Sequence, residues 1–487
     1  MDTLALSSPV GLAGAGLVVA YLVGIATAVD AIMHSRTPQG ATAWVFALAT
    51  IPFVAVPMYW LVGRFKFEDY LTSLREFDAE VAEGMEQATE GPLRPFLVHA
   101  GERGDDREAG EMCAFDTMAT LPFTRGNDVD LLVDGEATFE ALFAAIDAAE
   151  DYVLTQFYIV HDDALGRRYH RHLVEAAQRG VRVLFLYDSV GSLSLSRAYK
   201  RELKAAGVRV CPFTGPRNWL KRLRLNFRNH RKITVVDGRV GFVGGLNVGD
   251  EYLGRDPEIG AWRDTHLRVE GPLVQGLQLS FARDWFYGTR EELDGLRWEP
   301  EAADADRTAL VLTSGPADAL ETCGLLYTHA IESAEERVWI ATPYFVPDGR
   351  VLGALQLAAL RGVDVRVLVP RTSDSVLFKY VPYAYLPEVA RAGVKVSLYE
   401  PGFMHQKVAL VDRDFALVGT ANFDNRSFRL NFEATVVAHD AETCDALADM
   451  LESDFARSTP FTMEDLEAKP FAFRFAANAT RLLAPVL

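Results

Sequence analysis

Cysteine is scarce in this sequence, with only four in 487 residues, at positions 113, 211, 323 and 444. They lie singly, and no two of them have the close spacing of a zinc site or a redox-active pair. We therefore expect free thiols in a reducing compartment rather than a disulfide-stabilised secreted domain. Glycine-rich nucleotide loops and clusters of metal ligands are also missing, so we predict no metal and no other cofactor.

Positive charge is in short supply too, because 67 Asp and Glu residues outnumber 49 Lys and Arg residues and give a net charge of −18. Proteins that bind nucleic acid usually carry an excess of Lys and Arg that neutralises the phosphates. The charge balance therefore argues against nucleic acid as a partner. Hydrophobic residues make up 49% of the chain, a share that excludes a disordered or fibrous protein.

Charged residues are absent from two long apolar runs near the N-terminus, Ser7–Val29 and Thr37–Gly63. A helix needs about 20 residues to cross a hydrocarbon core of roughly 30 Å, so each run is long enough. Polar residues at 34–38 form a turn between them, and residues 1–66 are therefore predicted to be a transmembrane helical hairpin. Aromatic residues, which favour the membrane interface, lie towards the ends of the second run (Trp44, Tyr59 and Trp60).

A cleaved signal peptide and a pair of buried core helices are the alternatives to this hairpin. A signal peptide begins with basic residues, but Asp2 is the only charged residue before Asp30. Core helices rarely stay uncharged over such lengths. Basic residues are more frequent after the second run (Arg64, Lys66 and Arg75) than in the turn (Arg36). The positive-inside rule then places both termini in the cytoplasm.

The remainder of the chain is predicted to be α/β. Residues 67–120 are rich in Glu and Asp, and we expect a solvated connector of helix or loop. From about Leu121, apolar strand-like runs alternate with amphipathic helical runs, and this order occurs twice. The matching landmarks are the strands Tyr152–Thr155 and Val338–Ala341, the R-G-V sequences at 179–181 and 361–363, the strands Val181–Tyr187 and Val365–Val369, and the A-G-V sequences at 206–208 and 392–394.

These recurring landmarks indicate an internal duplication. The first repeat is placed at residues 121–290 and the second at 309–460, with a polar linker between them and a C-terminal tail at 461–487. The glycine at each helix-to-strand junction suits the left-handed residue that ends many helices.

Each repeat ends in the same series of polar residues. The first series is His230, Lys232, Asp237, Gly244-Gly245 and Asn247, and the second is His405, Lys407, Asp412, Gly419-Thr420 and Asn422. In both, Lys follows His by 2 positions, Asp by 7, the first Gly by 14 and Asn by 17. A single H-x-K would carry little weight, but two copies with one spacing inside a duplicated fold are hard to attribute to chance.

This spacing predicts a phosphate site. Residues two apart on a strand project from the same face, so each histidine and its lysine point into one site. The lysines can neutralise the nonbridging oxygens of a phosphate, and the amides of Asn247 and Asn422 can donate hydrogen bonds to them. The segments at Gly245 and Thr420 can present backbone N–H groups to the same anion.

The two motifs resemble the phospholipase D superfamily, whose mark is a duplicated HxKxxxxD followed by G-[GST]-x-N. Further runs resemble bacterial cardiolipin synthases, namely TQFYIVHDDALG at 155–166, TPYFVPD at 342–348 and GTANFDNRSFRLNFE at 419–433. The resemblance implies two α/β domains, each a mixed sheet flanked by helices, that meet face to face at the active site. It also implies a multi-pass protein of the bacterial inner membrane with its catalytic part in the cytoplasm.

The resemblance also implies roles for individual residues. One motif histidine attacks the phosphorus and becomes phosphatidylated, while the other protonates the departing glycerol and then takes a proton from the incoming alcohol. Glu433 matches the carboxylate that orients a histidine, and Asp264 is its less regularly spaced counterpart in the first repeat. Asp237 and Asp412 are expected to hold the motif strands and lysines in place.

A basic insert precedes the first motif. Gly207 and His230 are 23 positions apart, but the equivalent Gly393 and His405 only 12. The extra segment carries Arg217, Lys221, Arg222, Arg224 and Arg228 among apolar residues. We expect it to lie on the membrane and attract anionic headgroups, although pairing with the acidic connector is an alternative.

The leading functional expectation is transfer of a phosphatidyl group from one phosphatidylglycerol to another at the bilayer, giving cardiolipin and glycerol. A hydrolytic phospholipase D, a membrane-anchored nuclease and an inactive lipid-binding scaffold are the alternatives. The sequence leaves open which histidine attacks and what oligomer forms.

Overall fold

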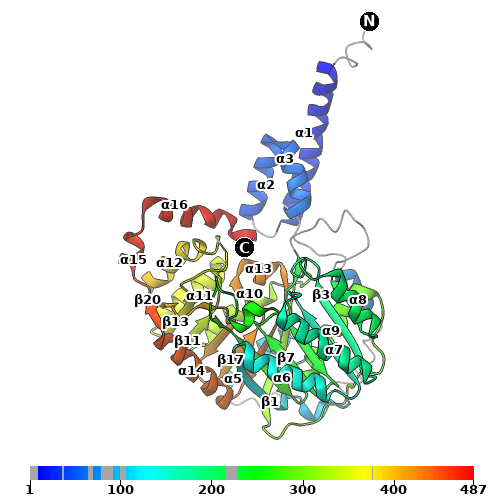
Figure 1. The fold of residues 1–487 in the computed structure, drawn as a ribbon. Helices are drawn as coiled ribbons and strands as arrows, with labels where there is room; N and C mark the ends of the chain where they lie inside the picture. The colour runs from blue at the N-terminus through cyan, green and yellow to red at the C-terminus, as the bar shows by residue number, and fades with distance from the viewer. Residues whose placement is uncertain are drawn as a thin grey trace. The chain divides into compact units, whose positions relative to one another are not determined.

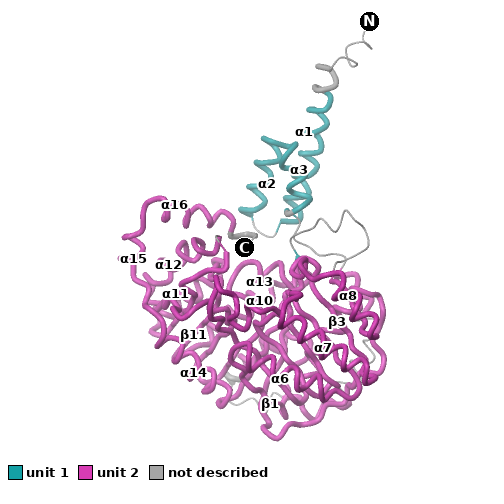
Figure 2. The backbone as a smooth tube through the Cα atoms, in the orientation of Figure 1, with its two compact units in different colours: residues 1–69, 215–227 teal, residues 70–214, 228–487 magenta. Residues whose placement is uncertain are grey.

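The computed structural model describes residues 9–35, 38–63, 70–77, 91–98, 106–213, 227–375 and 377–486. The chain divides into two compact units, which comprise residues 1–69 with 215–227 and residues 70–214 with 228–487 (Figure 2). The larger unit is α/β and holds both motifs, while the smaller one holds the N-terminal apolar runs.

A 16-stranded mixed sheet runs through the larger unit (Figure 1). The first repeat supplies β1 (Thr124–Val133), β2 (Tyr152–Phe157), β3 (Arg182–Asp188), β4 (Arg209–Phe213), β6 (Ile233–Val236), β7 (Val240–Gly244) and β9 (Thr265–Glu270). The second supplies β10 (Arg307–Ser314), β11 (Arg337–Ala341), β13 (Asp364–Pro370), β14 (Lys395–Tyr399), β16 (Val408–Val411), β17 (Phe415–Gly419), β19 (Asn431–His439) and β20 (Ser458–Pro460). Short β5 (Arg228–Asn229) pairs with β19 off the main path.

The strand order confirms the duplication and shows where the two repeats join. It reads β4-β3-β2-β6-β7-β9-β1 and continues as β10-β19-β17-β16-β11-β13-β14-β20. The halves join where β1 pairs antiparallel with β10, with Thr124 opposite Ala309. The repeats therefore share one continuous sheet at this edge, and β7 and β9 of the first repeat also contact β17 and β19 of the second. This junction leaves neither inner edge strand unpaired.

Helices follow the strands in both repeats. The first repeat has α6 (Asp134–Ala148), α7 (Ala164–Gln178), α8 (Arg197–Ala205) and α9 (Leu273–Thr289). The second has α10 (Thr322–Ser333), α11 (Gly349–Leu360), α12 (Leu386–Arg391) and α14 (Ala441–Ala456). The predicted left-handed glycines are confirmed, because φ is 93°, 97°, 95° and 101° at Gly180, Gly207, Gly362 and Gly393.

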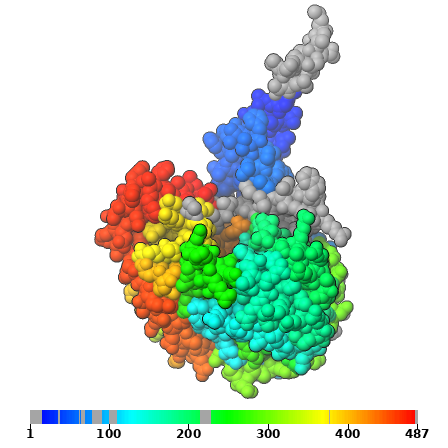
Figure 3. All heavy atoms as spheres, viewed as in Figure 1, coloured from blue at the N-terminus to red at the C-terminus, as the bar shows by residue number. Residues whose placement is uncertain are grey.

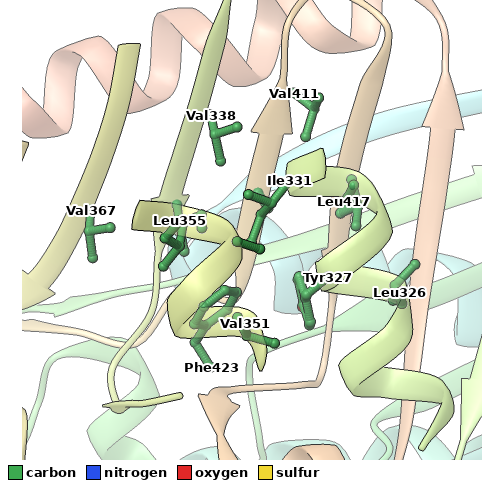
Figure 4. Close-up of a cluster of buried hydrophobic side chains, with 14 of the residues drawn as sticks. Leu326, Tyr327, Ile331, Val338, Val351, Leu355, Val367, Val411, Leu417 and Phe423 are labelled. Atoms are coloured by element: carbon green, nitrogen blue, oxygen red, sulfur yellow. The ribbon is translucent and has the colours of Figure 1, made fainter. Parts of the chain in front are cut away.

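The core of the second repeat lies between these helices and the sheet. In Figure 4, side chains of α10 and α11 pack against apolar residues of the strands, including Phe423 of the short strand β18 (Phe423–Asp424). The labelled set is Leu326, Tyr327, Ile331, Val351 and Leu355 with Val338, Val367, Val411, Leu417 and Phe423. All are buried, and the predicted apolar strand Val408–Val411 is the whole of β16. This packing fixes the strand that follows His405 and Lys407.

The segment 67–120 was expected to be a solvated connector. Its described parts instead contribute buried side chains to the core. Residues 70–77 are helical and bury Tyr70 and Phe77. Helix α5 (Asp106–Met118) buries Met112 and Phe115 in the core of the second repeat. In the tail, α16 (Phe471–Thr480) packs Phe473 on Tyr380 and Tyr383, at ring distances of 5.1 and 5.2 Å.

The smaller unit differs from the predicted hairpin of two spanning helices. Within α1 (Pro9–His34), residues 15–34 are long and apolar enough to cross a membrane. The second apolar run breaks into α2 (Pro38–Thr50) and α3 (Pro52–Met58), which continues as the π-helical turn η1 (Tyr59–Gly63). Pro52 is the physical cause, because it has no N–H to continue α2, and Ile51 before it leaves the helical region with φ −134° and ψ 58°.

Candidate active site

The motif residues sit just ahead of two equivalent strands. His230 and Lys232 precede β6, and His405 and Lys407 precede β16 after the short strand β15 (Phe403–Met404). All four side chains are buried. Each lysine Nζ donates to the carbonyl of its own histidine, at 2.6 Å from Lys232 and 2.5 Å from Lys407. Each His–Lys pair therefore forms one compact group, in agreement with the spacing argument.

The carboxylates reach the histidines crosswise. His230 Nδ1 lies 3.0 Å from Glu433 Oε2, and His405 Nδ1 lies 2.7 Å from Asp264 Oδ2. Each carboxylate thus belongs to the repeat opposite its histidine. Backbone pairing has the same crossed pattern, since β5 of the first repeat pairs with β19 and β15 of the second pairs with β8 (Trp262–Arg263). The sequence identified both carboxylates but could not reveal the exchange.

Electrostatic interactions link the two His–Lys pairs. Burial and the positive charges of Lys232 and Lys407 lower the pKa of His230 to about 4, although Glu433 raises it. Burial and the same two lysines lower the pKa of His405 to about 3. Because each histidine responds to the lysine of the other repeat, the four groups are close neighbours. At neutral pH both rings are uncharged and can act as nucleophile or base.

The lysines are perturbed as well. Burial lowers the pKa of Lys232 to about 7, with a further contribution from Lys407, while Glu433 opposes the shift. Burial lowers the pKa of Lys407 to about 8, against the attraction of Asp264 and Glu433. An arriving phosphate would add negative charge between these cations and stabilise their charged forms. The site is therefore suited to an anion.

Gly245 and Thr420 each contact one of the two orienting carboxylates, Asp264 and Glu433 respectively. A Cβ at Gly245 would lie 2.0 Å from Asp264 Oδ1, so only glycine leaves that carboxylate room. Thr420 Oγ1 donates to Glu433 Oε2 at 2.6 Å. The expected presentation of their backbone N–H groups to phosphate is wrong, because these groups donate to the carbonyls of Thr265 and Ala434.

The motif asparagines differ from each other. Asn247 Oδ1 accepts from the N–H of Ile159 at 3.0 Å, and Asn247 Nδ2 donates to the Tyr252 hydroxyl at 3.0 Å. Asn422 is buried, and its Oδ1 has no hydrogen-bond partner among the described residues. Their predicted contacts with phosphate stay predictions.

Asp237 and Asp412 stabilise the fold. Asp237 Oδ1 accepts from the N–H groups of Asp151 and Tyr152 at 2.8 and 2.7 Å, where β2 begins. Asp412 does the same at the start of β11 with Glu336 and Arg337. Both have positive φ, of 53° and 50°. They hold strands as expected, but the motif lysines bond to histidine carbonyls instead.

Two buried aspartates, which the sequence analysis did not single out, accept hydrogen bonds from residues next to the motif residues. Asp284 on α9 is fully buried and accepts hydrogen bonds from Asn229 and Arg231, which flank His230, at 2.8 Å each. It also accepts from the Tyr70 hydroxyl at 2.8 Å.

Asp454 on α14 is its counterpart. It is also fully buried and accepts from Gln406, between His405 and Lys407, and from Arg263, next to Asp264, at 3.0 Å each. The sequence does contain a pattern that could have identified this pair. Each aspartate is followed by an aromatic residue, Trp285 or Phe455, in a late helix of its repeat.

The predicted headgroup patch lies largely outside the described residues. Arg217, Lys221, Arg222 and Arg224 fall in the undescribed segment 214–226. Arg228 is described and is buried on β5, opposite Asn431 of β19. Its place two residues before His230 puts it on the catalytic strand rather than on an outer surface.

Comparison with known proteins agrees with this geometry. Residues 142–285 and 327–456 match the family described as Cardiolipin synthase, PLD-like domain, and residues 22–64 match Phospholipase_D-nuclease N-terminal. Cardiolipin synthase A of Pseudomonas aeruginosa is 45% identical over 471 residues, 97% of this chain and 95% of the relative. That of Pseudomonas fluorescens is 43% identical over 467 residues, 96% of this chain and 97% of the relative.

A solved structure supports the fold. Phosphatidylserine synthase of Haemophilus influenzae Rd KW20 aligns with a TM-score of 0.57 at 14% identity, covering 77% of this chain and 100% of that one. Together with the crossed histidine–carboxylate pairs, these matches establish that the chain belongs to the cardiolipin synthase family with phospholipase D-like domains.

Proposed function

We propose that this protein is a membrane-bound phosphatidyltransferase that makes cardiolipin and glycerol from two phosphatidylglycerol molecules. The observation that carries the proposal is the crossed pairing of His230 with Glu433 and of His405 with Asp264. It supplies two oriented imidazoles and two lysines in one anion-accepting site. The names of the relatives that match nearly the whole chain support the same activity.

The first step splits a phosphodiester. One histidine attacks phosphorus through Nε2, since its Nδ1 faces the carboxylate, and an N–P bond forms as the bond to the glycerol oxygen breaks. The other histidine gives a proton to that oxygen. It gains this proton when the anionic phosphate enters and raises its pKa. Lys232 and Lys407 neutralise the nonbridging oxygens in the transition state.

The second step reverses the first with a different alcohol. After glycerol leaves, a hydroxyl of the second phosphatidylglycerol gives its proton to the same histidine and attacks phosphorus. The N–P bond then breaks and frees the first histidine. One phosphodiester is exchanged for another, so no external energy source is needed. The histidine–carboxylate contact keeps each ring in the tautomer that this sequence of steps requires.

Membrane attachment favours a lipid acceptor over water or nucleic acid. Residues 15–34 of α1 can cross a bilayer, which brings the enzyme to a surface rich in lipid hydroxyls. A net charge of −18 is unfavourable for a nuclease. We place the enzyme in the bacterial inner membrane with its catalytic unit on the cytoplasmic side.

Product analysis tests the proposal. The purified full-length protein is incubated in vesicles with phosphatidylglycerol that is labelled separately in its glycerol headgroup and in its acyl chains. We expect acyl label in cardiolipin and headgroup label in both cardiolipin and free glycerol. Phosphatidic acid as the main product would identify a hydrolase and overturn the proposal. A His439→Ala variant, altered at the end of β19 away from the motifs, serves as the histidine control.

A further inference from the structure

The two halves of the active site are chemically unequal at equivalent positions. Two residues before the catalytic histidine, the first repeat has Arg228 and the second has Phe403. Their strand partners differ in the same sense, because Arg228 lies opposite Asn431 and Phe403 lies opposite Trp262. One half of the site therefore offers a cation and an amide where the other offers two aromatic rings.

The aromatic half surrounds His405. Ring centroids of Trp262, Phe403, Tyr252 and Tyr344 lie 4.9, 5.8, 6.4 and 6.4 Å from the His405 ring. Among the described residues, these four aromatic side chains bring no positive charge to His405, and Arg263 beside them is paired with Asp134 and Asp454. This aromatic half suits the reacting centre or an uncharged glycerol better than a second phosphate.

The cationic half adjoins His230. Tyr158 lies 5.0 Å from the His230 ring, and Arg228 and Arg426 both act on its hydroxyl, lowering a pKa that burial and Asp188 raise. Arg228 is only 8% exposed. Burial lowers the pKa of its guanidinium, the negative charge of Asp188 opposes this shift, and the nearby charge of Arg426 adds to it. Arg426 comes from α13 (Asn425–Arg429), just before β19, and so reaches this point from the other repeat. Two neighbouring guanidinium groups gain stability from an anion between them.

We propose that Arg228 and Arg426 form a second anion subsite, which holds the phosphodiester of the second phosphatidylglycerol. This inference rests on the proposed function, in which both substrates are anionic. Lys232 and Lys407 neutralise the phosphate that reacts, and the other phosphate needs cations of its own. Arginine binds a phosphodiester through paired N–H groups, a geometry that lysine cannot provide.

A competition between acceptors tests the subsite. Arg228→Gln and Arg426→Gln are compared with wild type in vesicles that contain phosphatidylglycerol as donor and ethanol as a second, neutral acceptor. We expect the ratio of cardiolipin to phosphatidylethanol to fall about tenfold or more, because a charged hydrogen bond to the anionic acceptor is lost. Arg413→Gln, which removes a surface arginine paired with Asp445, should leave the ratio unchanged.

A ratio is insensitive to the fraction of protein that folds. An unchanged ratio in both variants would overturn the subsite, because Arg228 and Arg426 would then not distinguish the two acceptors. If the wild type formed neither product, the proposed function would fail instead, so the two failures are distinguishable.

A second inference concerns the smaller unit and has independent evidence. Helices α2 and α3 run antiparallel, because the rings of Trp44 and Tyr59 lie 5.3 Å apart although 15 residues separate them. Their turn lies beside the middle of α1, where a Cβ at Gly24 would be 2.9 Å from the Leu48 carbonyl oxygen and 3.1 Å from Pro52 Cβ. Gly24 is ten residues from the end of α1 at His34. At 1.5 Å per residue, the turn reaches roughly 15 Å, about half the depth of a hydrocarbon core.

The exposed side chains at the tip of this turn are apolar and suit the hydrocarbon core of a membrane. Ile51, Phe53 and Val54 are 51%, 55% and 59% exposed, which would be unfavourable in water. The backbone of Ile51 is satisfied internally, since its N–H donates to Ala47 and its carbonyl accepts from Ala55. Polar backbone groups at membrane depth require such partners.

We infer that α2 and α3 enter and leave the membrane on the same face, so that α1 alone crosses it. The Tyr59 hydroxyl donates to Asp30 at 2.7 Å, which brings the end of α3 back to the end of α1. The N-terminus and the chain after Gly63 then lie on opposite sides. This arrangement reverses the expectation that both termini are cytoplasmic.

The charges agree with this topology. Arg36, Arg64, Lys66 and Arg75 all follow α1 in the sequence, while Asp2 is the only charged residue before α1. A spanning hairpin would put three of these basic residues on one side and Arg36 on the other, whereas a single crossing by α1 assigns all four to one side. The positive-inside rule then places the catalytic unit in the cytoplasm and the N-terminus in the periplasm.

Cysteine labelling tests this topology in the full chain. On a Cys113→Ser background, which removes the exposed native thiol, Thr3→Cys and Glu442→Cys are treated with a membrane-impermeant maleimide. The outer membrane is permeabilised so that the maleimide reaches the periplasm while the inner membrane stays intact. Cardiolipin formation is measured in each variant to confirm that the protein is active. We expect Thr3→Cys to react in intact cells and Glu442→Cys only after lysis. Labelling of both positions on the same side, or in the reverse order, would overturn the topology.

Discussion

His405 Nδ1 lies 2.7 Å from Asp264 Oδ2, although the two residues belong to different repeats and are 141 positions apart. His230 and Glu433 make the reciprocal contact across 203 positions. Because the orienting carboxylates are exchanged, neither repeat holds a complete catalytic pair by itself. We therefore propose that the duplicated sequence encodes one active site and not two.

Removal of either carboxylate charge should disable catalysis while leaving the fold intact. Glu433→Gln and Asp264→Asn are expected to lower kcat about 10²- to 10⁴-fold, the usual contribution of a positioned acid–base group. The measurement is cardiolipin formation at saturating phosphatidylglycerol, with thermal unfolding to confirm folding. Asp445→Asn, an exposed carboxylate paired with Arg413, is the control. Full activity in Glu433→Gln would contradict the assigned role.

A single added methyl group at Gly245 should have a similar effect. In Gly245→Ala the Cβ would collide with Asp264 Oδ1, and the carboxylate would have to move away from His405. We expect at least about tenfold lower kcat, since small displacements of catalytic groups are costly. Gly353→Ala is the matched control, because a Cβ there meets nothing within 4 Å inside α11. It should retain full activity and gain about 0.5–1 kcal/mol of stability. Equal activity of both variants would contradict the explanation for glycine at 245.

Asp284 should contribute strongly to stability, because it is the counter-charge of the buried Arg231. Asp284→Asn leaves the buried guanidinium of Arg231 without its counter-charge, which is expected to cost about 3–5 kcal/mol. Tyr70→Phe removes one neutral donor to the same carboxylate and should cost only about 1 kcal/mol. Thermal unfolding of the detergent-solubilised protein measures both. A loss in Asp284→Asn no larger than that in Tyr70→Phe would show that Asp284 does not support the buried arginine.

The pH dependence of kcat/KM should reflect the titration of Lys232 and Lys407. Burial lowers the pKa of Lys232 to about 7 and that of Lys407 to about 8, so their charged forms are present below these values and are lost as pH rises through them. Because kcat/KM reports the free enzyme, it should fall above about pH 7–8. The histidines stay neutral down to about pH 4, so no decline is expected between pH 5 and 7. A kcat/KM that kept rising through pH 9 would contradict the lysine assignment.

The sequence predicted those features that depend on local spacing. The apolar strands after each motif are β6 and β16, and the glycines at 180, 207, 362 and 393 have the expected positive φ. The spacing also predicted that each histidine and its lysine lie together, although the pair sits just ahead of the strand and the contact is from Nζ to the histidine carbonyl. These features require only neighbouring residues, so a single sequence contains them.

Features that depend on distant contacts were not accessible in the same way. The exchange of Glu433 and Asp264 arises from β5–β19 and β15–β8 pairing, which no local pattern encodes. The second apolar run has the length of a spanning helix, but Pro52 and the contacts of Tyr59 with Trp44 and Asp30 fold it back. The sequence alone does not distinguish Asp284 and Asp454 from other helix carboxylates. Their burial and their hydrogen bonds to residues beside the motif histidines appear only in the structure.

Activity of the two single-histidine variants tests the composite site most directly. His230→Ala and His405→Ala are purified separately and assayed for cardiolipin formation from phosphatidylglycerol. If the repeats form one site in which both imidazoles act on one phosphorus, each variant should retain less than about 1% of wild-type activity. If either variant retained about half of that activity, the repeats would act independently, and the account of a shared site would be wrong.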